Sequence, residues 1–490
     1  MTPSLILLPW LILHIILFVL ITLHCLQRRR NASSTILWIF IAFSLPILGA
    51  LLYLSFGIDR VGDRGFLKFL TDQHLLEIRR TTPDHTPHAH RQHPDGTTAD
   101  DEFQREFNRT LDALLPDHPP LTGNTIHPLV SGDEAYPAML NAIRNARHHI
   151  HLQSFIIGND SISHEFIDAL AAKARTGVEV RLLYDRFGST PALFGRLFHK
   201  ANNIPHFRVA GWTQANLLKR QFQINLRNHR KSLIIDGTIA FFGGVNIQSK
   251  NTSAHRAGPI RDYHFQAEGP IVQEIQYSFL RDWYFITQES PQKLLTTAYF
   301  PPSEPTGHIT ARLIDSGPST LEDLAVESFF SSTVLAKKQI LAVTPYFVPS
   351  EDILRALRSA ALRGVDVRLV VPQKNNHRFA GYANRALYED LLLAGVRIYE
   401  RRPPFLHAKA FIVDGKFALV GTANLDVRSL HLNYETCIAI FSESFADAMK
   451  DIIHEDIDDY SDEIILAKWQ HRPKSQQLLE NLASLMTPVL

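Results

Sequence analysis

The sequence predicts an α/β protein with two similar domains, each a mostly parallel sheet flanked by helices, behind an N-terminal two-helix transmembrane hairpin. Three observations support this prediction. Strand-like and helix-like segments alternate through most of the chain, which is typical of α/β units. The same order of segments, with the same polar residues, occurs twice. Two long uncharged apolar stretches precede both copies.

Length and composition set the limits. The chain has 490 residues, too many for one hydrophobic core, because domains usually contain roughly 100 to 200 residues. Its 50 basic and 49 acidic side chains give a net charge of +1, and without a basic arm we expect no nucleic-acid partner. Cys25 and Cys437 are the only cysteines, so neither a disulfide framework nor a Cys-based zinc site is expected. The sequence indicates no cofactor, no metal and no obligate protein partner.

The first 57 residues predict a transmembrane hairpin, with spans at about residues 4–26 and 34–56. Both stretches lack Asp, Glu, Lys and Arg, and each approaches the roughly 20 helical residues that cross a bilayer. The first is longer than the 7 to 15 residue core of a signal peptide and has no basic leader. Arginines at 28–30 would place the connection between the spans in the cytoplasm, but the basic residues at 60–68 favour the opposite orientation. The sequence therefore does not determine on which side of the membrane the domains lie.

Residues 58–124 are interpreted as a linker and connecting segment. From residue 79 onward they are rich in Pro, Thr, Asp and His and show no apolar periodicity. Four of the histidines, at positions 85, 88, 90 and 93, are interpreted as part of a solvated connector rather than as metal ligands. The first domain is expected at 125–300 and the second at 301–490.

The alternation within the domains is regular. In the first domain it predicts a helix at 136–149, a strand at 150–157, a helix at 164–177 and a strand at 178–185. Residues 333–372 repeat the order of helix, strand, helix and strand. Gly177 and Gly364 are typical of residues that end helices. The repetition indicates two domains of the same design.

A longer pattern is also written twice. "LRNHRKSLIIDGTIAFFGGVN" at 226–246 and "PFLHAKAFIVDGKFALVGTAN" at 404–424 both contain a His followed by Lys, Asp, Gly and Asn at the same spacings. The Asp-Gly pair in each copy predicts a two-residue hairpin turn, because Asp and Gly accept positive φ. Side chains two apart on a strand share a face, so each copy presents an imidazole beside an ammonium.

This pairing suits phosphoryl transfer without a metal. Lysine supplies positive charge to phosphate oxygens, while histidine attacks phosphorus or protonates a departing oxygen. One histidine cannot do both at once, so we predict a single site assembled from the two copies. The candidate catalytic residues are His229, Lys231, Asp236, His407, Lys409 and Asp414, with Asn246 and Asn424 binding phosphate. For Asp236 and Asp414, a role as turn former or distant ion-pair partner is as well supported as a catalytic one.

Two further pairs accompany the motifs. A nucleophilic imidazole needs its second nitrogen oriented, usually by a carboxylate, and we hypothesise that Asp262 and Glu435 fill this role. They follow the two motifs at similar distances. Phe155 and Tyr346 occupy matching strand ends, where either lining of the site or core packing explains them.

With its two HxKxxxxD signatures, the chain resembles the phospholipase D superfamily. Within it, "RNHRKSLIIDG", "RDYHFQAEGPIV", "TPYFVP", "LHAKAFIVDG" and "GTANLDVRSLHLNYE" resemble the bacterial cardiolipin synthases, as do the paired N-terminal spans. The resemblance implies two phospholipase D-like domains. It implies that His229 forms a phosphatidyl-histidine and that His407 protonates the departing glycerol, although the near-equivalent halves permit the exchanged roles.

The expected activity follows from the resemblance. It is transfer of a phosphatidyl group from one phosphatidylglycerol to another, which gives cardiolipin and glycerol, in a multi-pass protein of the cell (inner) membrane. The alternative is a membrane-anchored phospholipase D or other phosphodiesterase, in which water replaces the acceptor. The spans favour a lipid substrate, whereas the choice between transfer and hydrolysis depends on the shape of the cavity. Acceptor range, acyl-chain preference and oligomeric state are not determined by the sequence.

Overall fold

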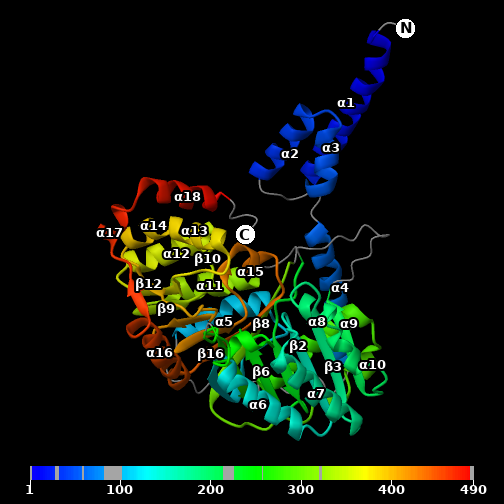
Figure 1. Ribbon diagram of the computed structural model, residues 1–490, viewed down its shortest axis with the longest axis vertical. Coiled ribbons are helices and arrows are strands. Elements are labelled where there is room, and N and C mark those ends of the chain that lie inside the picture. The colour runs from blue at the N-terminus through cyan, green and yellow to red at the C-terminus, as the bar shows by residue number, and fades with distance from the viewer. Residues whose placement is uncertain are drawn as a thin grey trace. The chain divides into compact units, whose positions relative to one another are not determined.

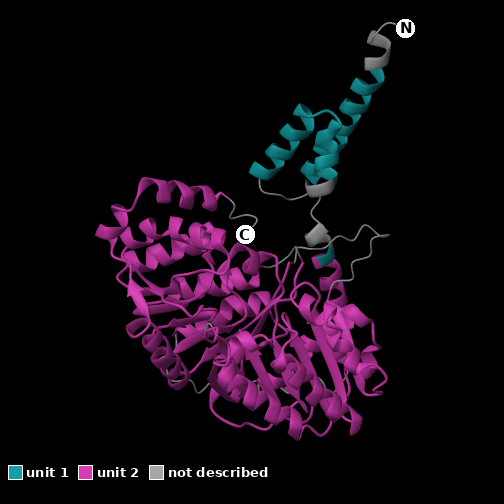
Figure 2. Ribbon diagram, viewed as in Figure 1, with its two compact units in different colours: residues 1–64 teal, residues 65–490 magenta. Residues whose placement is uncertain are grey.

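The computed structural model describes residues 3–27, 32–57, 60–81, 102–212, 226–256, 258–318 and 323–485. The chain forms two compact units, residues 1–64 and residues 65–490 (Figure 2). Figure 1 labels the helices and strands of both units. The four histidines of the predicted linker, at 85, 88, 90 and 93, lie outside the described residues.

The first unit contains one helix long enough to cross a bilayer. This helix is α1 (Pro3–Gln27), and its apolar window covers Leu8–Gln27. The second predicted span is not one continuous helix, so the predicted hairpin of two spans is not confirmed. It is divided into α2 (Ala32–Ser44), α3 (Leu48–Leu52) and the π-helical turn η1 (Tyr53–Gly57).

The division of the second stretch has a local cause. Pro46 has no N–H to donate, and its ring disfavours the helical conformation at the residue before it. Ile47 follows with a φ of 61°, which no α-helix accepts. The sequence prediction treated Pro46 as tolerable within a span, but in the structure it ends the helix.

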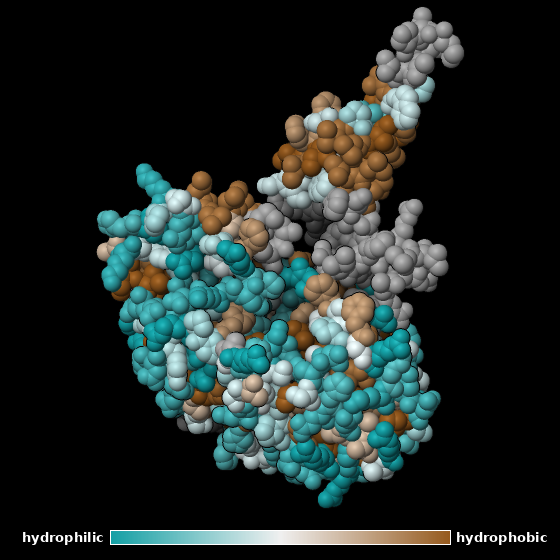
Figure 3. Space-filling model, viewed as in Figure 1, coloured by the Kyte–Doolittle hydropathy of each residue, from teal (hydrophilic) through white to brown (hydrophobic). Residues whose placement is uncertain are grey.

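Most apolar side chains of the first unit face outward. Its small core contains Ile21, Cys25, Ala42, Ala50 and Tyr53. Many large apolar side chains between Leu8 of α1 and Phe43 of α2 are exposed, and Figure 3 shows a largely hydrophobic surface on the visible face of this unit. A soluble protein rarely exposes apolar surface of this extent, which agrees with a lipid environment for this unit.

A single mixed sheet runs through the second unit. Its order is β17-β12-β11-β9-β13-β14-β16-β8-β1-β7-β6-β5-β2-β3-β4. The two halves meet where β8 pairs with β1, and from this junction outward the strands of one half correspond to those of the other. Both predicted domains therefore contribute to one sheet within one compact unit.

The prediction of a mostly parallel sheet is corrected by this topology. Only β2, β3 and β4 in the first half, and β9, β11 and β12 in the second, pair in parallel. The remaining pairs of the large sheet are antiparallel. Two of these pairs, β5 with β6 and β13 with β14, have a local cause, because an Asp-Gly turn joins each as a hairpin and hairpin strands are antiparallel.

The strands have the following bounds. In the first half they are β1 (Leu121–Val130), β2 (His149–Ser154), β3 (Glu179–Asp185), β4 (Phe207–Trp212), β5 (Ser232–Ile235), β6 (Ile239–Gly243) and β7 (Tyr263–Glu268). In the second half they are β8 (Ile309–Ser316), β9 (Gln339–Val343), β11 (Asp366–Pro372), β12 (Arg397–Arg401), β13 (Ala410–Val413), β14 (Phe417–Gly421), β16 (Glu435–Phe441) and β17 (Ser461–Glu463). A separate parallel pair consists of β10 (Phe347–Val348) and β15 (Leu425–Asp426).

The helices that cover the sheet are also paired between the halves. One face carries α6 (Ser131–Asn145) and α7 (Ser161–Arg175) in the first half, and α11 (Leu324–Leu335) and α12 (Glu351–Leu362) in the second. The opposite face carries α9 (Ile271–Thr287) and α16 (Glu443–Asp458). The segment predicted as a connection contains α4 (Arg60–Thr81) and α5 (Glu102–Leu114), and α5 packs into the core of the second half. The shorter helices are α8 (Thr190–Phe194), α10 (Pro291–Leu294), α13 (Arg378–Ala386), α14 (Tyr388–Leu393), α15 (Val427–His431), α17 (Leu466–Gln470), α18 (Lys474–Ser484) and the 3₁₀ turns η2 (Leu197–Ala201), η3 (Ser249–Asn251) and η4 (Thr297–Tyr299).

The repeated motif has the predicted local structure. Asp236 and Asp414 occupy the first turn position with φ of 54° and 53°, and the glycines after them also have positive φ. The motif glycines Gly243 and Gly421 lie where a Cβ atom would approach a main-chain carbonyl oxygen of the next strand to 2.7 and 2.1 Å. Any side chain there would force the strands apart, which explains why both copies keep glycine.

Candidate active site

The two motif histidines lie where the halves of the second unit meet. The main-chain N–H of His229, just before β5, donates to the carbonyl oxygen of Tyr434 at 2.9 Å. The N–H of His407, just before β13, donates to the carbonyl oxygen of Arg261 at 2.7 Å. Each histidine is therefore held by main chain from the opposite half.

The side chains cross between the halves in the same way. Nδ1 of His229 lies 2.9 Å from Oε2 of Glu435, and Nδ1 of His407 lies 2.6 Å from Oδ2 of Asp262. An ionised carboxylate only accepts hydrogen bonds, so it fixes the ring proton on Nδ1 and leaves the lone pair on Nε2. The structure thus brings both predicted orienting carboxylates to the rings, each to the histidine of the other copy.

The two carboxylates differ in electrostatic environment. Burial raises the pKa of Glu435 to about 7, against the opposing effect of Lys231. Burial also acts on Asp262, but Lys409 and His407 outweigh it and hold its pKa below the ordinary value. Asp262 therefore stays ionised at a pH where Glu435 begins to take up a proton.

The imidazoles and ammonium groups share this buried environment. Burial, together with the two motif lysines, holds the pKa of His229 well below its ordinary value, and burial lowers that of His407 to about 4. Burial also lowers the pKa of Lys231 to about 7 and that of Lys409 to about 8. A bound anion would raise all four values, because it favours the charged forms.

The lysines contact the main chain of their own histidines. Nζ of Lys231 donates to the carbonyl oxygen of His229 at 2.6 Å. Nζ of Lys409 contacts the carbonyl oxygen of His407 and lies 2.8 Å from its Nδ1. The Lys409 ammonium is therefore next to the imidazole of His407, whereas that of Lys231 contacts the main chain of His229.

The imidazoles line one cavity of about 500 Å³. Asn246 and Asn424 line it as well, and Oδ1 of Asn246 accepts the N–H of Ile156 at 3.0 Å, which leaves its NH₂ group for another acceptor. Phe155 and Tyr346 also line this cavity, which confirms one of the two explanations considered for them. The Phe155 ring lies 4.9 Å from that of His229.

Asp236 and Asp414 are placed elsewhere. The carboxylate of Asp236 accepts three main-chain N–H groups, from residues 147–149, at 2.7 to 2.9 Å. That of Asp414 accepts the N–H groups of residues 337–339 over the same range of distances. Neither aspartate is among the described residues that line the cavity. Both join their hairpin turn to the start of the neighbouring strand, which is the structural alternative considered for them.

A buried polar network that sequence reasoning missed supports His229. Asp282 of α9 accepts from Nδ2 of Asn228 at 2.7 Å and from Nη1 of Arg230 at 3.0 Å, so it holds the residues on both sides of His229. Lys68 of α4 lies 3.0 Å from the same carboxylate. Asn228 and Arg230 were visible as neighbours of the motif histidine, but no pattern indicated Asp282 or Lys68 as their partners.

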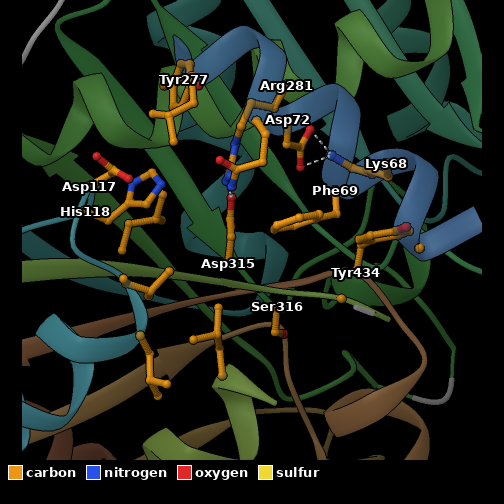
Figure 4. Close-up of a pocket in the computed structure, with 18 of the residues that line it drawn as sticks. Lys68, Phe69, Asp72, Asp117, His118, Tyr277, Arg281, Asp315, Ser316 and Tyr434 are labelled. Carbon is orange, nitrogen blue, oxygen red and sulfur yellow. Dashed lines mark hydrogen bonds and ion pairs between the residues drawn. The ribbon is translucent and has the colours of Figure 1, made fainter. Parts of the chain in front are cut away.

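A second cavity, of about 330 Å³, adjoins this network. Figure 4 shows Lys68 and Asp72 on its wall, joined by an ion pair, with Arg281 directed at Asp315. The charges on its wall are therefore paired. Within the described ranges, no group of three or more His, Cys, Asp or Glu side chains is arranged to hold a metal ion.

Comparisons with known proteins agree with this geometry. Residues 139–283 and 334–457 match the family model described as "Cardiolipin synthase, PLD-like domain", and residues 6–57 match "Phospholipase D-nuclease N-terminal". The crystal structure of phosphatidylserine synthase from Haemophilus influenzae superposes with a TM-score of 0.60 at 14% identity, covering 78% of this chain and 100% of that one. The fold and the doubled motif thus define a phospholipase D-like protein.

Similarity to curated sequences identifies the family of the chain more narrowly. Cardiolipin synthase of Geobacillus thermodenitrificans is 34% identical over 480 residues, which cover 94% of this chain and 90% of the relative. Cardiolipin synthase A of Pseudomonas putida is 31% identical over 484 residues, covering 97% and 96%. The chain belongs to the cardiolipin synthase family.

Proposed function

We propose that the protein is a cardiolipin synthase that transfers the phosphatidyl group of one phosphatidylglycerol to the glycerol headgroup of another. One observation carries the proposal. Two imidazoles from different halves line one cavity, and each has its Nδ1 bound to a carboxylate of the opposite half. This arrangement provides one nucleophile and one acid for a single phosphorus atom.

The reaction has two steps that balance. Nε2 of His229 attacks the phosphorus of the donor, a P–N bond forms, and the P–O bond to glycerol breaks as His407 protonates the departing oxygen. A hydroxyl of the acceptor phosphatidylglycerol then gives its proton to His407 and attacks the same phosphorus. The P–N bond breaks, His229 is restored and cardiolipin leaves. Lys231, Lys409, Asn246 and Asn424 stabilise the negative charge on the phosphate oxygens.

The environments of the two carboxylates support this division of roles. Asp262 keeps its charge because its pKa lies below the ordinary value, and an ionised partner favours an imidazolium at His407, as an acid requires. The ionised form of Glu435 keeps the ring proton of His229 on Nδ1 and the lone pair on Nε2, while burial holds the pKa of His229 well below its ordinary value and so keeps the imidazole neutral and nucleophilic. The exchanged assignment is tested below.

The membrane unit supports a lipid substrate. We propose that α1 spans the cell inner membrane, that α2 and α3 enter the same lipid from the opposite direction, and that phosphatidylglycerol reaches the site from the bilayer surface. The substrates are then lipids and not nucleic acids, in agreement with the near-neutral charge of the chain.

Purified full-length protein in phosphatidylglycerol vesicles tests the proposal. We expect cardiolipin and free glycerol in equal amounts, without added nucleotide. The variants His229→Ala and His407→Ala should each lose at least about 10³-fold in kcat while keeping the wild-type thermal unfolding midpoint. Phosphatidic acid as the sole product would show that the protein is a hydrolase instead. Wild-type turnover by both variants would exclude the proposed two-histidine mechanism.

A further inference from the structure

Three arginines line the active-site cavity in addition to the motif histidines and asparagines. They are Arg227, two positions before His229, Arg378 at the start of α13, and Arg428 in α15. In the proposed two-step reaction, two lysines and two asparagines already stabilise the negative charge of the donor phosphate, the one whose P–O bond is broken. The arginines therefore provide positive charge beyond the needs of that phosphate.

Arg227 is held in place without an acidic partner. Its guanidinium stacks on Phe187, 3.8 Å from the ring centroid. Within the described ranges, no carboxylate oxygen lies within 4.0 Å of Arg227, and its buried Nε has no hydrogen-bond partner. Burial and the neighbouring Arg428 lower the pKa of Arg227 to about 10. A half-buried guanidinium beside a second one is a site that an anion would stabilise.

The cavity lining contains little negative charge, and the carboxylate that it contains is engaged in a helix cap. Asp426 is the one carboxylate among the described residues that line it. Its Oδ1 accepts the Ser429 N–H at 2.7 Å and its Oδ2 lies 3.5 Å from the Ser429 hydroxyl, so it caps α15. Among the described residues that line the cavity, arginines therefore outnumber carboxylates by three to one.

The excess does not follow the two-fold relation of the motifs. Counted from the histidines, Arg227 corresponds to Phe405 and Arg428 corresponds to Lys250. Neither Phe405 nor Lys250 is among the described residues that line the cavity. The catalytic groups are duplicated but the arginines are not, so they serve something that the reaction requires only once.

We propose that Arg227 and Arg428, with Arg378 on the same wall, bind the phosphodiester of the acceptor phosphatidylglycerol. This inference rests on the proposed function. The acceptor differs from water in carrying its own phosphate, one glycerol unit away from the hydroxyl that attacks. An anion site on the wall of the cavity that both histidines line holds the acceptor in position and favours transfer over hydrolysis. A planar guanidinium is suited to two parallel hydrogen bonds with a phosphodiester.

Two activities of the full-length protein separate the acceptor site from the reacting site. Cardiolipin formation needs both phosphates, whereas exchange of labelled glycerol into phosphatidylglycerol needs only the donor phosphate. We expect Arg227→Gln to lower the ratio of cardiolipin formation to glycerol exchange by about 10- to 100-fold, as expected for loss of a charge-assisted contact. The deficit should shrink as the mole fraction of phosphatidylglycerol in mixed vesicles rises, and Arg227→Lys should restore part of the ratio.

The control is Arg175→Gln, an exposed arginine at the end of α7, which should leave both activities at the wild-type level. An unchanged ratio in Arg227→Gln, or a parallel loss of both activities in Arg227→Gln and Arg428→Gln, would overturn the inference. Wild-type protein that exchanges glycerol but forms no cardiolipin would instead overturn the proposed function. The two failures are therefore distinguishable.

Discussion

Nδ1 of His229 lies 2.9 Å from Oε2 of Glu435, a residue 206 positions further along the chain. The equivalent contact in the other copy joins His407 to Asp262, and the main-chain N–H groups of both histidines cross in the same direction. Neither half of the second unit therefore contains a complete site. Each half supplies one histidine and also the carboxylate that binds the histidine of the opposite half. The site is therefore complete only when both halves are folded together.

Removing the charge of Glu435 is expected to reduce catalysis without reducing binding. In Glu435→Gln the side-chain volume is kept, but the carboxylate that fixes the His229 tautomer is lost. We expect kcat for cardiolipin formation to fall by about 10² to 10⁴-fold with little change in KM. Steady-state kinetics on phosphatidylglycerol micelles measure both quantities.

The control for this variant is Glu463→Gln, which removes a carboxylate of β17 that is paired with Arg397 at the surface. It should retain wild-type kcat. Adding Glu435→Gln to His229→Ala should lower kcat no further, because the two residues act as one unit. Independent, multiplicative losses would contradict the pairing.

The buried lysines predict an alkaline limit to activity near neutral pH. Burial lowers the pKa of Lys231 to about 7 and that of Lys409 to about 8, so both ammonium groups lose their protons as pH rises through this range. We expect kcat/KM, which reports the free enzyme, to fall between about pH 7 and 8. The bound phosphodiester adds negative charge and raises both pKa values, so the fall in kcat should occur at higher pH.

Rate profiles from pH 5 to 10 at constant ionic strength would show the two limits. The same alkaline limit in kcat and kcat/KM would show that neither lysine meets the substrate charge. A limit near the ordinary lysine pKa, about 10.4, would show that the two ammonium groups are not desolvated as the structure indicates.

The motif aspartates are expected to serve stability rather than catalysis. In Asp236→Asn the residue can keep its positive φ, but the amide has one acceptor oxygen where the carboxylate accepts three N–H groups. We expect the free energy of unfolding to fall by about 1 to 3 kcal/mol, with kcat of the folded fraction within about threefold of wild type. Thermal unfolding in detergent and activity below the midpoint measure the two effects.

Asp168→Asn is the matched control, because Asp168 is exposed and paired with Lys200 at the surface. It should change the unfolding free energy by less than about 1 kcal/mol. If Asp236→Asn instead lost kcat by orders of magnitude while keeping its stability, the aspartate would be part of the catalytic apparatus.

The sequence predicted those features of the site that depend on short spacings. His229 and Lys231 are two apart, and the Asp-Gly turn fixes the hairpin that carries them, so local rules are sufficient. The convergence of the two histidines was also predictable, because duplication of a complete motif has no use if the copies stay apart. The same hairpins make the sheet mixed, which the alternation of helices and strands concealed.

The rest depends on contacts that sequence spacing does not encode. Asp282 and Arg230 are 52 positions apart in the sequence, and only the packing of α9 on the sheet brings them together. The crossing of Asp262 and Glu435 between the halves depends on how the two domains join. At Pro46 two effects oppose each other: the proline interrupts a helix, whereas the long apolar stretch favours a continuous membrane span. The absence of charged residues does not show which effect is stronger.

Lys68 is expected to contribute strongly to stability through its contact with Asp282. It is 2% exposed, and its Nζ lies 2.8 Å from Asp72 and 3.0 Å from Asp282. Lys68→Met leaves the buried carboxylate of Asp282 with less compensating charge, so we expect a loss of about 3 kcal/mol in unfolding free energy. Because Asp282 holds Asn228 beside His229, a modest fall in kcat should accompany it.

Lys337→Met provides the comparison for this variant, since Lys337 is 68% exposed and paired with Glu102 at the surface. We expect it to leave the thermal unfolding midpoint close to the wild-type value, because an exposed ion pair contributes little to stability. Equal effects of the two substitutions on the thermal unfolding midpoint would show that the buried network is no more important than a surface ion pair.

The assignment of nucleophile and acid is testable with a lipid whose leaving group needs no protonation. In phosphatidyl p-nitrophenol the leaving group departs as the stable p-nitrophenolate, so a variant that lacks only the acid still forms the covalent phosphatidyl-histidine. We expect His407→Ala to release about one equivalent of nitrophenolate per protein in a rapid burst and to retain a phosphatidyl label after denaturation. His229→Ala, which lacks the nucleophile, should show neither. A burst from His229→Ala and none from His407→Ala would assign the roles the other way, because both rings line the same cavity and each has a carboxylate at its Nδ1.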